Sequence, residues 1–296
     1  MDGLALELSP ACPHYLVLVR LVRGLPMQLL TRIVHRRVGV LCLFATVAGL
    51  VAPRRASAEP PWVDRHVVLP EHDWAFDLGM GIAHDYAPPQ NPTGVGFDFE
   101  GAVSPVDRLE IGVRTGVRIG DDGRATQADA YGRLFDRQTF GTFHDVVADP
   151  EIRVRGALLR GNIVEVGAEG RLFLPVEQGS EVGILFGVPL LFHLGEVARI
   201  DTGLYVPVVF ESPVDASLSA PVDVWFQATR KLWLGPMTGF VYDFTSRHAD
   251  VPLGLGLGYQ VVRNVDLKAE FLFPALNDTQ GAQTFGVGFG MQVRIE

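Results

Sequence analysis

The sequence predicts an all-β fold, a transmembrane antiparallel up-and-down β-barrel of about 12 strands. The closing segment gives the clearest signal. From Phe285 to Ile295 every odd position is apolar, and glycine, glutamine or arginine stands between the apolar residues. Alternation with period 2 places the apolar side chains on one face of an extended strand. The pattern recurs through most of the chain, which favours an outer-membrane barrel over a soluble sandwich.

The alternating segments follow one another from Trp74 onwards. In the first, apolar residues alternate with Ala75, Asp77 and two glycines, and the third alternates in the same way with Glu110 and Arg114. Proline within four of the segments, at positions 189, 207, 221 and 236, removes a ladder donor and is expected at a bulge or a strand end. The expected strands are 74–82, 95–103, 109–119, 152–158, 164–174, 184–192, 200–208, 218–226, 232–244, 251–259, 265–273 and 285–295.

The connections between these segments alternate between short and long. Short turns are expected at 104–107, 161–162, 195–198, 230–231 and 263–264. Longer loops are expected at 85–93, 120–148, 175–181, 211–217, 245–250 and 274–282. Outer-membrane barrels have short periplasmic turns and longer external loops. This order predicts a protein of the outer membrane with both termini in the periplasm.

The N-terminal region resembles a secretory signal peptide spanning residues 1–58. A basic cluster at 35–37 precedes the apolar run 38–52, and Ala56-Ser57-Ala58 forms an A-x-A cleavage motif that predicts cleavage between Ala58 and Glu59. A transmembrane anchor is the alternative, although the apolar run is short for one. Met27 would be a more ordinary start, which makes 1–26 a candidate N-terminal extension. Residues 59–73 are then a periplasmic lead, and 74–296 form the barrel.

Composition supports the same class. The chain is 48% hydrophobic with a mean hydropathy of +0.21, yet beyond the N-terminal region it contains no uncharged run of 18 residues. A membrane protein without spanning helices satisfies its backbone by closing a barrel. Cys12 and Cys42 both precede residue 59, so the remainder has no disulfide or thiolate metal site. That remainder carries 18 basic against 32 acidic residues, a net charge of −14, which argues against nucleic acid as a partner.

The polar positions of the strands carry charges of both signs. Such charges belong on the lumen side, because a charge facing lipid near the midplane costs several kcal/mol. One interpretation is a salt-bridged interior that stiffens the wall. The other is a polar conduit in which Arg114, Arg118, Arg153 and Arg155 form one basic wall facing carboxylates from other strands. The lumen-lining candidates are Asp98, Glu100, Glu110, Arg114, Arg118, Arg153, Arg155, Glu165, Glu169, Arg171, Asp223, Asp266, Lys268, Glu270 and Arg294.

Motifs for catalysis, metal or phosphate binding are weak. Ser246 and His248 lie in a short predicted loop, and His193 has no serine near it in sequence, so each histidine is expected in a loop or at the rim. The run 121–123 (DDG) is a turn signal with too few ligands for calcium. The glycines of the GxGxG run 254–258 lack the strand-to-helix context of a phosphate loop and are expected as small lumen-side residues. We predict no catalytic residue, no metal and no cofactor.

Two short motifs resemble the transporter-like outer-membrane barrels, such as the phenol-degradation MetA-type family. The first comprises 144–146 (HDV) followed by 151–154 (EIRV), and the second is 172–176 (LFLPV), a strand that ends in proline before an external loop. His144 stands where the family has glycine, and the family's glycine after the proline is missing. The resemblance covers 74–296 and implies passage of small, often hydrophobic molecules, with no catalytic residues.

The sequence therefore predicts a pore or transporter for small molecules across the outer membrane, without enzymatic activity. A non-conducting structural or adhesion-type barrel is the alternative, and a lipid-modifying outer-membrane hydrolase is the second alternative. The expected partners are outer-membrane lipid, the barrel-assembly machinery through the C-terminal strand, and a small-molecule solute.

Overall fold

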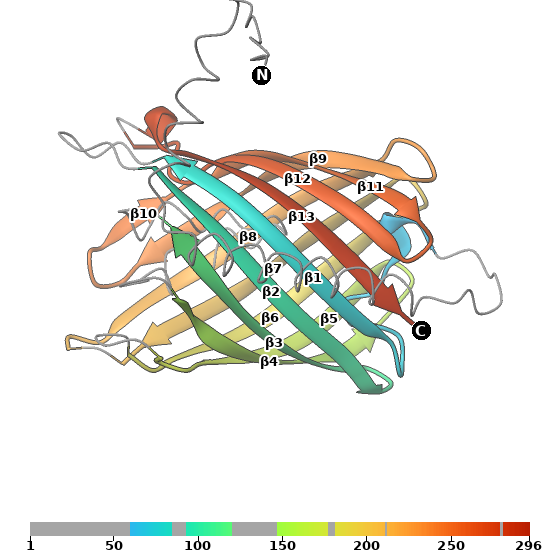
Figure 1. Ribbon diagram of the computed structural model, residues 1–296, viewed down its shortest axis with the longest axis horizontal. Helices are drawn as coiled ribbons and strands as arrows, with labels where there is room; N and C mark the ends of the chain where they lie inside the picture. Colours follow the sequence, from blue (N-terminus) through green and yellow to red (C-terminus); the bar gives the residue numbers. More distant parts are fainter. Residues whose placement is uncertain (1–59, 85–92, 120–146, 177–180, 211, 279–280) are drawn as a thin grey trace, which may run out of the picture. The chain divides into compact units, whose positions relative to one another are not determined.

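The computed structural model describes residues 60–84, 93–119, 147–176, 181–210, 212–278 and 281–296 (Figure 1). The predicted signal region with Ala58 and Glu59, the run 121–123 and the family-like run 144–146 lie outside these residues, and so does the side chain of Arg118. The strands are β1 (Trp74–His84), β2 (Thr93–Val106), β3 (Leu109–Ile119), β4 (Val147–Arg160), β5 (Val164–Phe173), β6 (Gly183–Leu194), β7 (Ala198–Val209), β8 (Asp215–Gln227), β9 (Leu232–Asp243), β10 (His248–Asp250), β11 (Leu253–Val262), β12 (Val265–Phe273) and β13 (Phe285–Ile295). Short 3₁₀ turns, η1 (Trp62–Asp64) and η3 (Gly281–Gln283), precede β1 and β13.

The strands form one closed antiparallel sheet. Almost every long strand pairs with the strands before and after it along the chain, and β1 pairs with β13 from Trp74↔Ile295 to His84↔Phe285, which closes the barrel. The short β10 pairs with the far end of β9, whose near end pairs with β11. Pro252 lies between β10 and β11, so the two are one strand interrupted by proline. The predicted barrel of 12 strands is confirmed, with β10 as an extra short piece.

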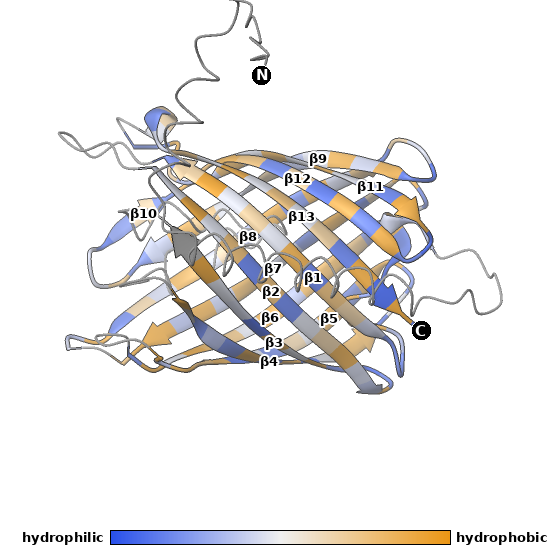
Figure 2. Cartoon of the chain, in the orientation of Figure 1, coloured by the Kyte–Doolittle hydropathy of each residue, from blue (hydrophilic) through white to orange (hydrophobic). Residues whose placement is uncertain are grey.

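The inner and outer faces follow the alternation of the sequence. Figure 2 shows hydrophobic and hydrophilic residues in alternating bands along the strands. Large apolar side chains of the outer face are exposed, among them Leu172 at 37%, Leu204 at 54% and Phe271 at 37%. The charged residues between them are mostly buried. Because a protein in water does not leave its apolar face exposed along a whole sheet, this pattern is typical of a barrel surrounded by lipid.

The described strands contain six prolines: Pro105 of β2 and Pro150 of β4 lie at register shifts, and the four prolines of β6–β9 each lie where the ladder is interrupted on one side. Each of these four faces a gap in the register toward one neighbouring strand, and each keeps its pairing with the other neighbour. At Pro221 the gap toward β7 is bridged by a side chain, because the Thr202 hydroxyl donates to the Pro221 carbonyl at 2.6 Å. The backbone N–H that proline lacks is therefore absent at places where the ladder of β6–β9 is already irregular. The residues that face the prolines across these gaps are Gly167 (Pro189), Ser217 (Pro207), Gly203 (Pro221) and Val224 (Pro236).

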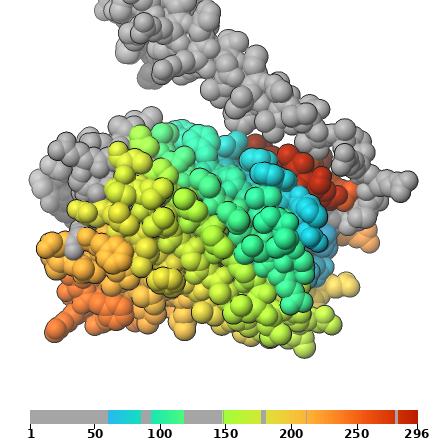
Figure 3. Space-filling view, turned by 90° about the horizontal axis from the view of Figure 1, so that it is seen from below, coloured from blue at the N-terminus to red at the C-terminus, as the bar shows by residue number. Residues whose placement is uncertain are grey.

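The space-filling view shows neighbouring strands as bands that follow the order of the sequence around the wall (Figure 3). Strands joined at the end where β13 finishes have short turns, such as 107–108 between β2 and β3, whereas most connections at the opposite end are longer, such as 174–182 and 274–284. Among the residues that the structure describes, no helix has both the length and the apolarity needed to cross a membrane.

Candidate functional site

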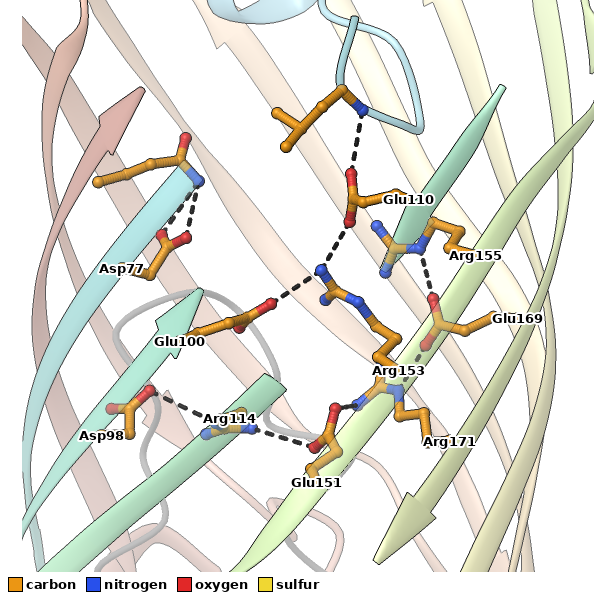
Figure 4. A network of polar contacts seen from close by, with 12 residues as sticks. Asp77, Asp98, Glu100, Glu110, Arg114, Glu151, Arg153, Arg155, Glu169 and Arg171 are labelled. Atoms are coloured by element: carbon orange, nitrogen blue, oxygen red, sulfur yellow. Dashed lines mark hydrogen bonds and ion pairs between the residues drawn. The ribbon is translucent and has the colours of Figure 1, made fainter. Parts of the chain in front are cut away.

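The inner face of β2–β5 carries an interlinked group of ion pairs (Figure 4). At its centre lies Arg153 of β4, whose guanidinium reaches Glu100 of β2 at 2.8 Å and Glu110 of β3 at 2.6 Å. All three side chains are at most 6% exposed. Antiparallel register explains the contact: Arg153 lies opposite Gly112, and the missing side chain there leaves room for the guanidinium to pass over β3.

Further pairs extend this group along the wall. Arg114 lies 3.5 Å from Asp98 and 4.0 Å from Glu151, and Arg171 lies 3.5 Å from Glu151. Glu169 accepts hydrogen bonds from both Arg171 and Arg155, the latter at 2.5 Å. We call this set the charge-paired wall: Asp98, Glu100, Glu110, Arg114, Glu151, Arg153, Arg155, Glu169 and Arg171.

The charge-paired wall corrects one of the two sequence interpretations. Arg114, Arg153 and Arg155 do not form a basic wall that faces acids across the lumen. Their carboxylate partners come from the same four neighbouring strands, so the charges are neutralised locally. The reason is the register, which places an acidic residue within reach of each arginine. The side chain of Arg118, the fourth predicted member, is not among those described.

A second region of the inner face is aromatic. Trp233 of β9 and Trp225 of β8 lie over the glycine positions of β11: a Cβ at Gly258 would lie 2.1 Å from the Trp233 ring, and one at Gly256 would lie 2.5 Å from the Trp225 ring. Met237 and Leu272 pack beside them and are 1% exposed. The glycines of the GxGxG run therefore face the lumen, and they are small because two indoles occupy the space above them. We call Trp225, Trp233, Met237 and Leu272, with the glycines of β11, the aromatic wall.

The segment 60–73, which we call the inner segment, runs inside the barrel. Its residues 62–69 contact inner-face side chains of β3, β5, β6, β7, β9 and β12, which lie on different sides of the barrel, so this part lies in the lumen. Val63 and Val68 are 0% and 2% exposed. Figure 1 places it near the end of the barrel where β13 finishes. The sequence predicted only a lead before the first strand.

The first half of the inner segment binds the aromatic wall. The Trp62 ring stacks on Trp233 with 4.9 Å between centroids and 2° between planes, and it meets Trp225 edge-on at 6.4 Å. Cationic groups surround the same indole: Lys268 Nζ lies 4.7 Å from its centroid, and the Arg65 and Arg199 guanidinium carbons each lie 5.1 Å away. Stacking and cation–π contacts of this kind stabilise a buried tryptophan beyond its area burial.

Charged side chains fix the backbone of the inner segment at several points. Arg65 pairs with Asp266 at 2.6 Å, and Asp266 also accepts from Arg294 at 2.8 Å. Arg199 donates to the carbonyls of Trp62 and Arg65 at 3.1 and 2.9 Å. Because guanidinium and carboxylate groups satisfy the irregular backbone, this stretch can lie inside the barrel without regular secondary structure.

The second half of the inner segment contacts the charge-paired wall and β5–β6. Glu110 accepts from the Leu69 amide at 3.0 Å, and Arg155 donates to the Val67 carbonyl at 3.3 Å. Glu165, whose side chain is 0% exposed, lies 2.5 Å from His66 Nδ1 and 2.9 Å from His193 Nε2.

The remaining lumen candidates are placed as follows. Asp223 is buried in β8 opposite Asp201, whose carboxylate pairs with Arg199 at 2.7 Å. Glu270 is 6% exposed in β12. Lys268 contacts the inner segment through Trp62.

The histidines proposed for a hydrolase have other partners. His248 Nε2, in the short strand β10 rather than in a loop, lies 3.2 Å from Asp250 of the same strand and from Asp278 in the connection between β12 and β13, and Ser246 uses its backbone amide to contact Asp243 at 2.8 Å. His193 contacts Glu165 and the Val63 carbonyl. These contacts are those of carboxylate-bound histidines, and the described hydrogen bonds of these two histidines do not reach a serine hydroxyl.

Several important residues were missing from the sequence candidates. They are Glu151, which precedes the expected strand 152–158 and links Arg114 to Arg171, and Trp62, Arg65 and His66, which lie in the segment before the first strand. Local pattern could not reveal them, because the inner segment lacks period 2 and its partners are about 40 to 200 residues away in the chain.

Comparison with known proteins places the fold among outer-membrane channels. An outer-membrane channel from Pseudomonas putida F1 superposes with a TM-score of 0.53 and 10% identity over 81% of this chain and 100% of that protein. The NanC porin gives 0.52 and 8% over 74% and 100%, and the KdgM porin gives 0.50 and 8% over 75% and 99%. At such identities the likeness concerns the fold. No family model and no curated protein matches the chain.

Proposed function

We propose that this chain forms a narrow outer-membrane pore for small molecules. The exposed apolar belt fits a barrel surrounded by lipid, and the solved barrels with a similar fold are described as a channel and porins. The short-turn end, the N-terminal region and the C-terminus then lie in the periplasm, and β13 is the strand that the barrel-assembly machinery would engage.

The observation that carries the proposal is the inner face itself. Polar and charged groups from at least eight strands face the barrel interior, and a polar interior is typical of barrels that conduct water and solutes. The inner segment contacts opposite parts of the wall, so we place the constriction of the route beside it. A solute must therefore pass beside the inner segment or cross after the segment has moved.

A non-conducting barrel is the second candidate, and the charge-paired wall favours it. Arginines that are paired locally stiffen a wall, as the scaffold interpretation of the sequence expects, and the inner segment adds ties across the lumen. The two candidates differ in whether any conductance exists when the inner segment is loosened.

Planar-bilayer recordings of the refolded protein separate these candidates. We compare wild type with the double variant Trp62→Ala/Arg65→Ala, which removes the stacking on Trp233 and the ion pair with Asp266. We expect small open events for wild type and larger, more frequent ones for the double variant, because the constriction loses two of its attachments. His72→Ala serves as the control, since that imidazole lies in the same segment and is 79% exposed. Proteins that insert and never open in either form would exclude the pore and leave the non-conducting barrel.

A further inference from the structure

The groups that meet at Glu165 form a cluster that the pore does not require. His66 belongs to the inner segment, Glu165 to β5 and His193 to the end of β6. Their ligand atoms, one nitrogen from each histidine and one carboxylate oxygen, all lie within 4.8 Å of one another. Two imidazole nitrogens approach the same oxygen, Glu165 Oε1, at 2.5 and 2.9 Å.

Hydrogen bonding fixes which nitrogen of His193 carries a proton. Its Nδ1 lies 2.8 Å from the Val63 carbonyl, and a carbonyl oxygen can only accept, so Nδ1–H is the donor. In the neutral ring Nε2 then has a lone pair, and that lone pair points at a carboxylate oxygen that also only accepts. Two acceptors at 2.9 Å need a positive centre between them, which is either a second proton on the ring or a metal ion.

We propose that His66, Glu165 and His193 bind a divalent transition-metal ion such as Zn²⁺, which ties the inner segment to the barrel wall. Two imidazoles and one carboxylate are a ligand set suited to Zn²⁺. The Nδ1–H bond from His193 to the Val63 carbonyl is the outer contact that commonly orients a metal-binding histidine. The second oxygen of Glu165 is held in the same way, by the Val67 amide at 3.1 Å.

The accessibility and the ligand spacing of this cluster allow a metal ion to bind after the barrel has folded. The Glu165 and His193 side chains are 0% and 10% exposed, whereas the His66 side chain is 46% exposed and gives an open side. Tetrahedral Zn²⁺ separates its ligand atoms by about 3.3 Å, so His66 moves outward by under about 1 Å, into space that is open. The nearby Arg155 guanidinium is paired with Glu169 at 2.5 Å, which limits its repulsion of the ion.

The second group of possible ligands differs in setting. His248 and Asp250 lie in the short strand β10 and Asp278 in the connection after β12, and the His248 and Asp278 side chains are 51% and 50% exposed. That group is a useful internal comparison, because it offers a similar number of ligand atoms without a buried carboxylate or an oriented imidazole.

The test uses the refolded mature protein in detergent micelles, stripped with EDTA, and titrates Zn²⁺ by calorimetry. We expect one strong site in wild type. His66→Ala and His193→Ala are expected to weaken that site by about 100-fold or more, since loss of an outer contact alone costs about 10- to 100-fold. Two matched controls, His72→Ala in the same segment and His248→Ala in the second group, are expected to leave it unchanged. Heat-dependent migration in gel electrophoresis verifies that each variant folds.

The outcomes decide between the sites. No strong binding in wild type, or full binding in a folded His66→Ala variant, would overturn the proposal. Loss only in His248→Ala would assign the metal to the external group and likewise overturn it. Binding should also stabilise the folded barrel. We expect Zn²⁺ to raise the denaturant midpoint of wild type but not that of His66→Ala. Neither measurement needs conductance, so a barrel that never opens excludes the pore and leaves the metal site standing.

Discussion

The charge-paired wall and the aromatic wall lie on the inner face of the same barrel, and each fills the interior with a different kind of side chain. In β2–β5 long charged side chains fill the space, and each arginine has a carboxylate within 4.0 Å. In β8, β9 and β11 indoles fill it, and glycines on β11 leave room for them. Both inner faces come from period-2 strands. The alternation therefore determines which residues point inward, but it does not determine whether those residues are charged, aromatic or small.

The strands of both walls contain irregularities at proline. Pro105 of β2 and Pro150 of β4 lie at register shifts beside the charge-paired wall, and Pro221 of β8 and Pro236 of β9 lie beside gaps in the strands that carry the aromatic wall. The inner segment links both regions, with Trp62 on the aromatic wall and Leu69 on the charge-paired wall. A change in either wall should therefore affect the segment, although by different energies.

The largest effect is expected from breaking the centre of the charge-paired wall. Arg153→Met leaves the buried carboxylates of Glu100 and Glu110 without their shared cation, and removal of one partner of a buried pair costs about 3–5 kcal/mol. Denaturant titration of the protein in lipid vesicles measures the loss in free energy of unfolding.

A matched variant distinguishes charge from packing at this centre. Adding Glu100→Gln and Glu110→Gln to Arg153→Met removes the two negative charges that Arg153 balanced, so most of the lost stability should return. If the single variant loses no more than about 1 kcal/mol, the range of a solvated surface pair, the lumen around Arg153 is wet and the walls do not differ as described.

A smaller effect is expected from crowding the aromatic wall. Gly258→Ala places a Cβ 2.1 Å from the Trp233 ring, and overpacking of this kind costs about 1–3 kcal/mol. Gly170→Ala on β5 is the control, because a Cβ there meets nothing within 4 Å. Tryptophan fluorescence during denaturant titration measures the shift in the unfolding midpoint. Equal midpoints for both variants would mean that the indoles do not rest on β11.

The smallest effect is expected at the exposed end of the charged strands. Arg160 of β4 pairs with Asp107 at 2.9 Å, but the Asp107 side chain is 56% exposed. An exposed pair contributes about 0–1 kcal/mol, so Arg160→Ala should shift the unfolding midpoint far less than Arg153→Met on the same strand. A loss as large as that of Arg153→Met would show that burial does not separate the two pairs.

The sequence by itself determined the barrel, the approximate strands and the alternation of faces along them. Alternation carries this information locally, because period 2 in an extended chain fixes a side chain's face whatever its neighbours are. The same pattern placed the glycines of β11 on the lumen side. It assigned charges of both signs to the interior, yet it did not decide between a basic wall and a paired wall.

Only the tertiary structure decided how those inward residues combine. Arg153 meets Glu100 and Glu110 because strand register and closure bring β2, β3 and β4 together, and no local pattern contains the register. The inner segment shows this most clearly, since Arg65 meets Asp266 and His66 meets Glu165 across separations of 201 and 99 residues. Contacts of that kind form because the closed barrel surrounds the irregular inner segment with strands that are distant from it in the sequence.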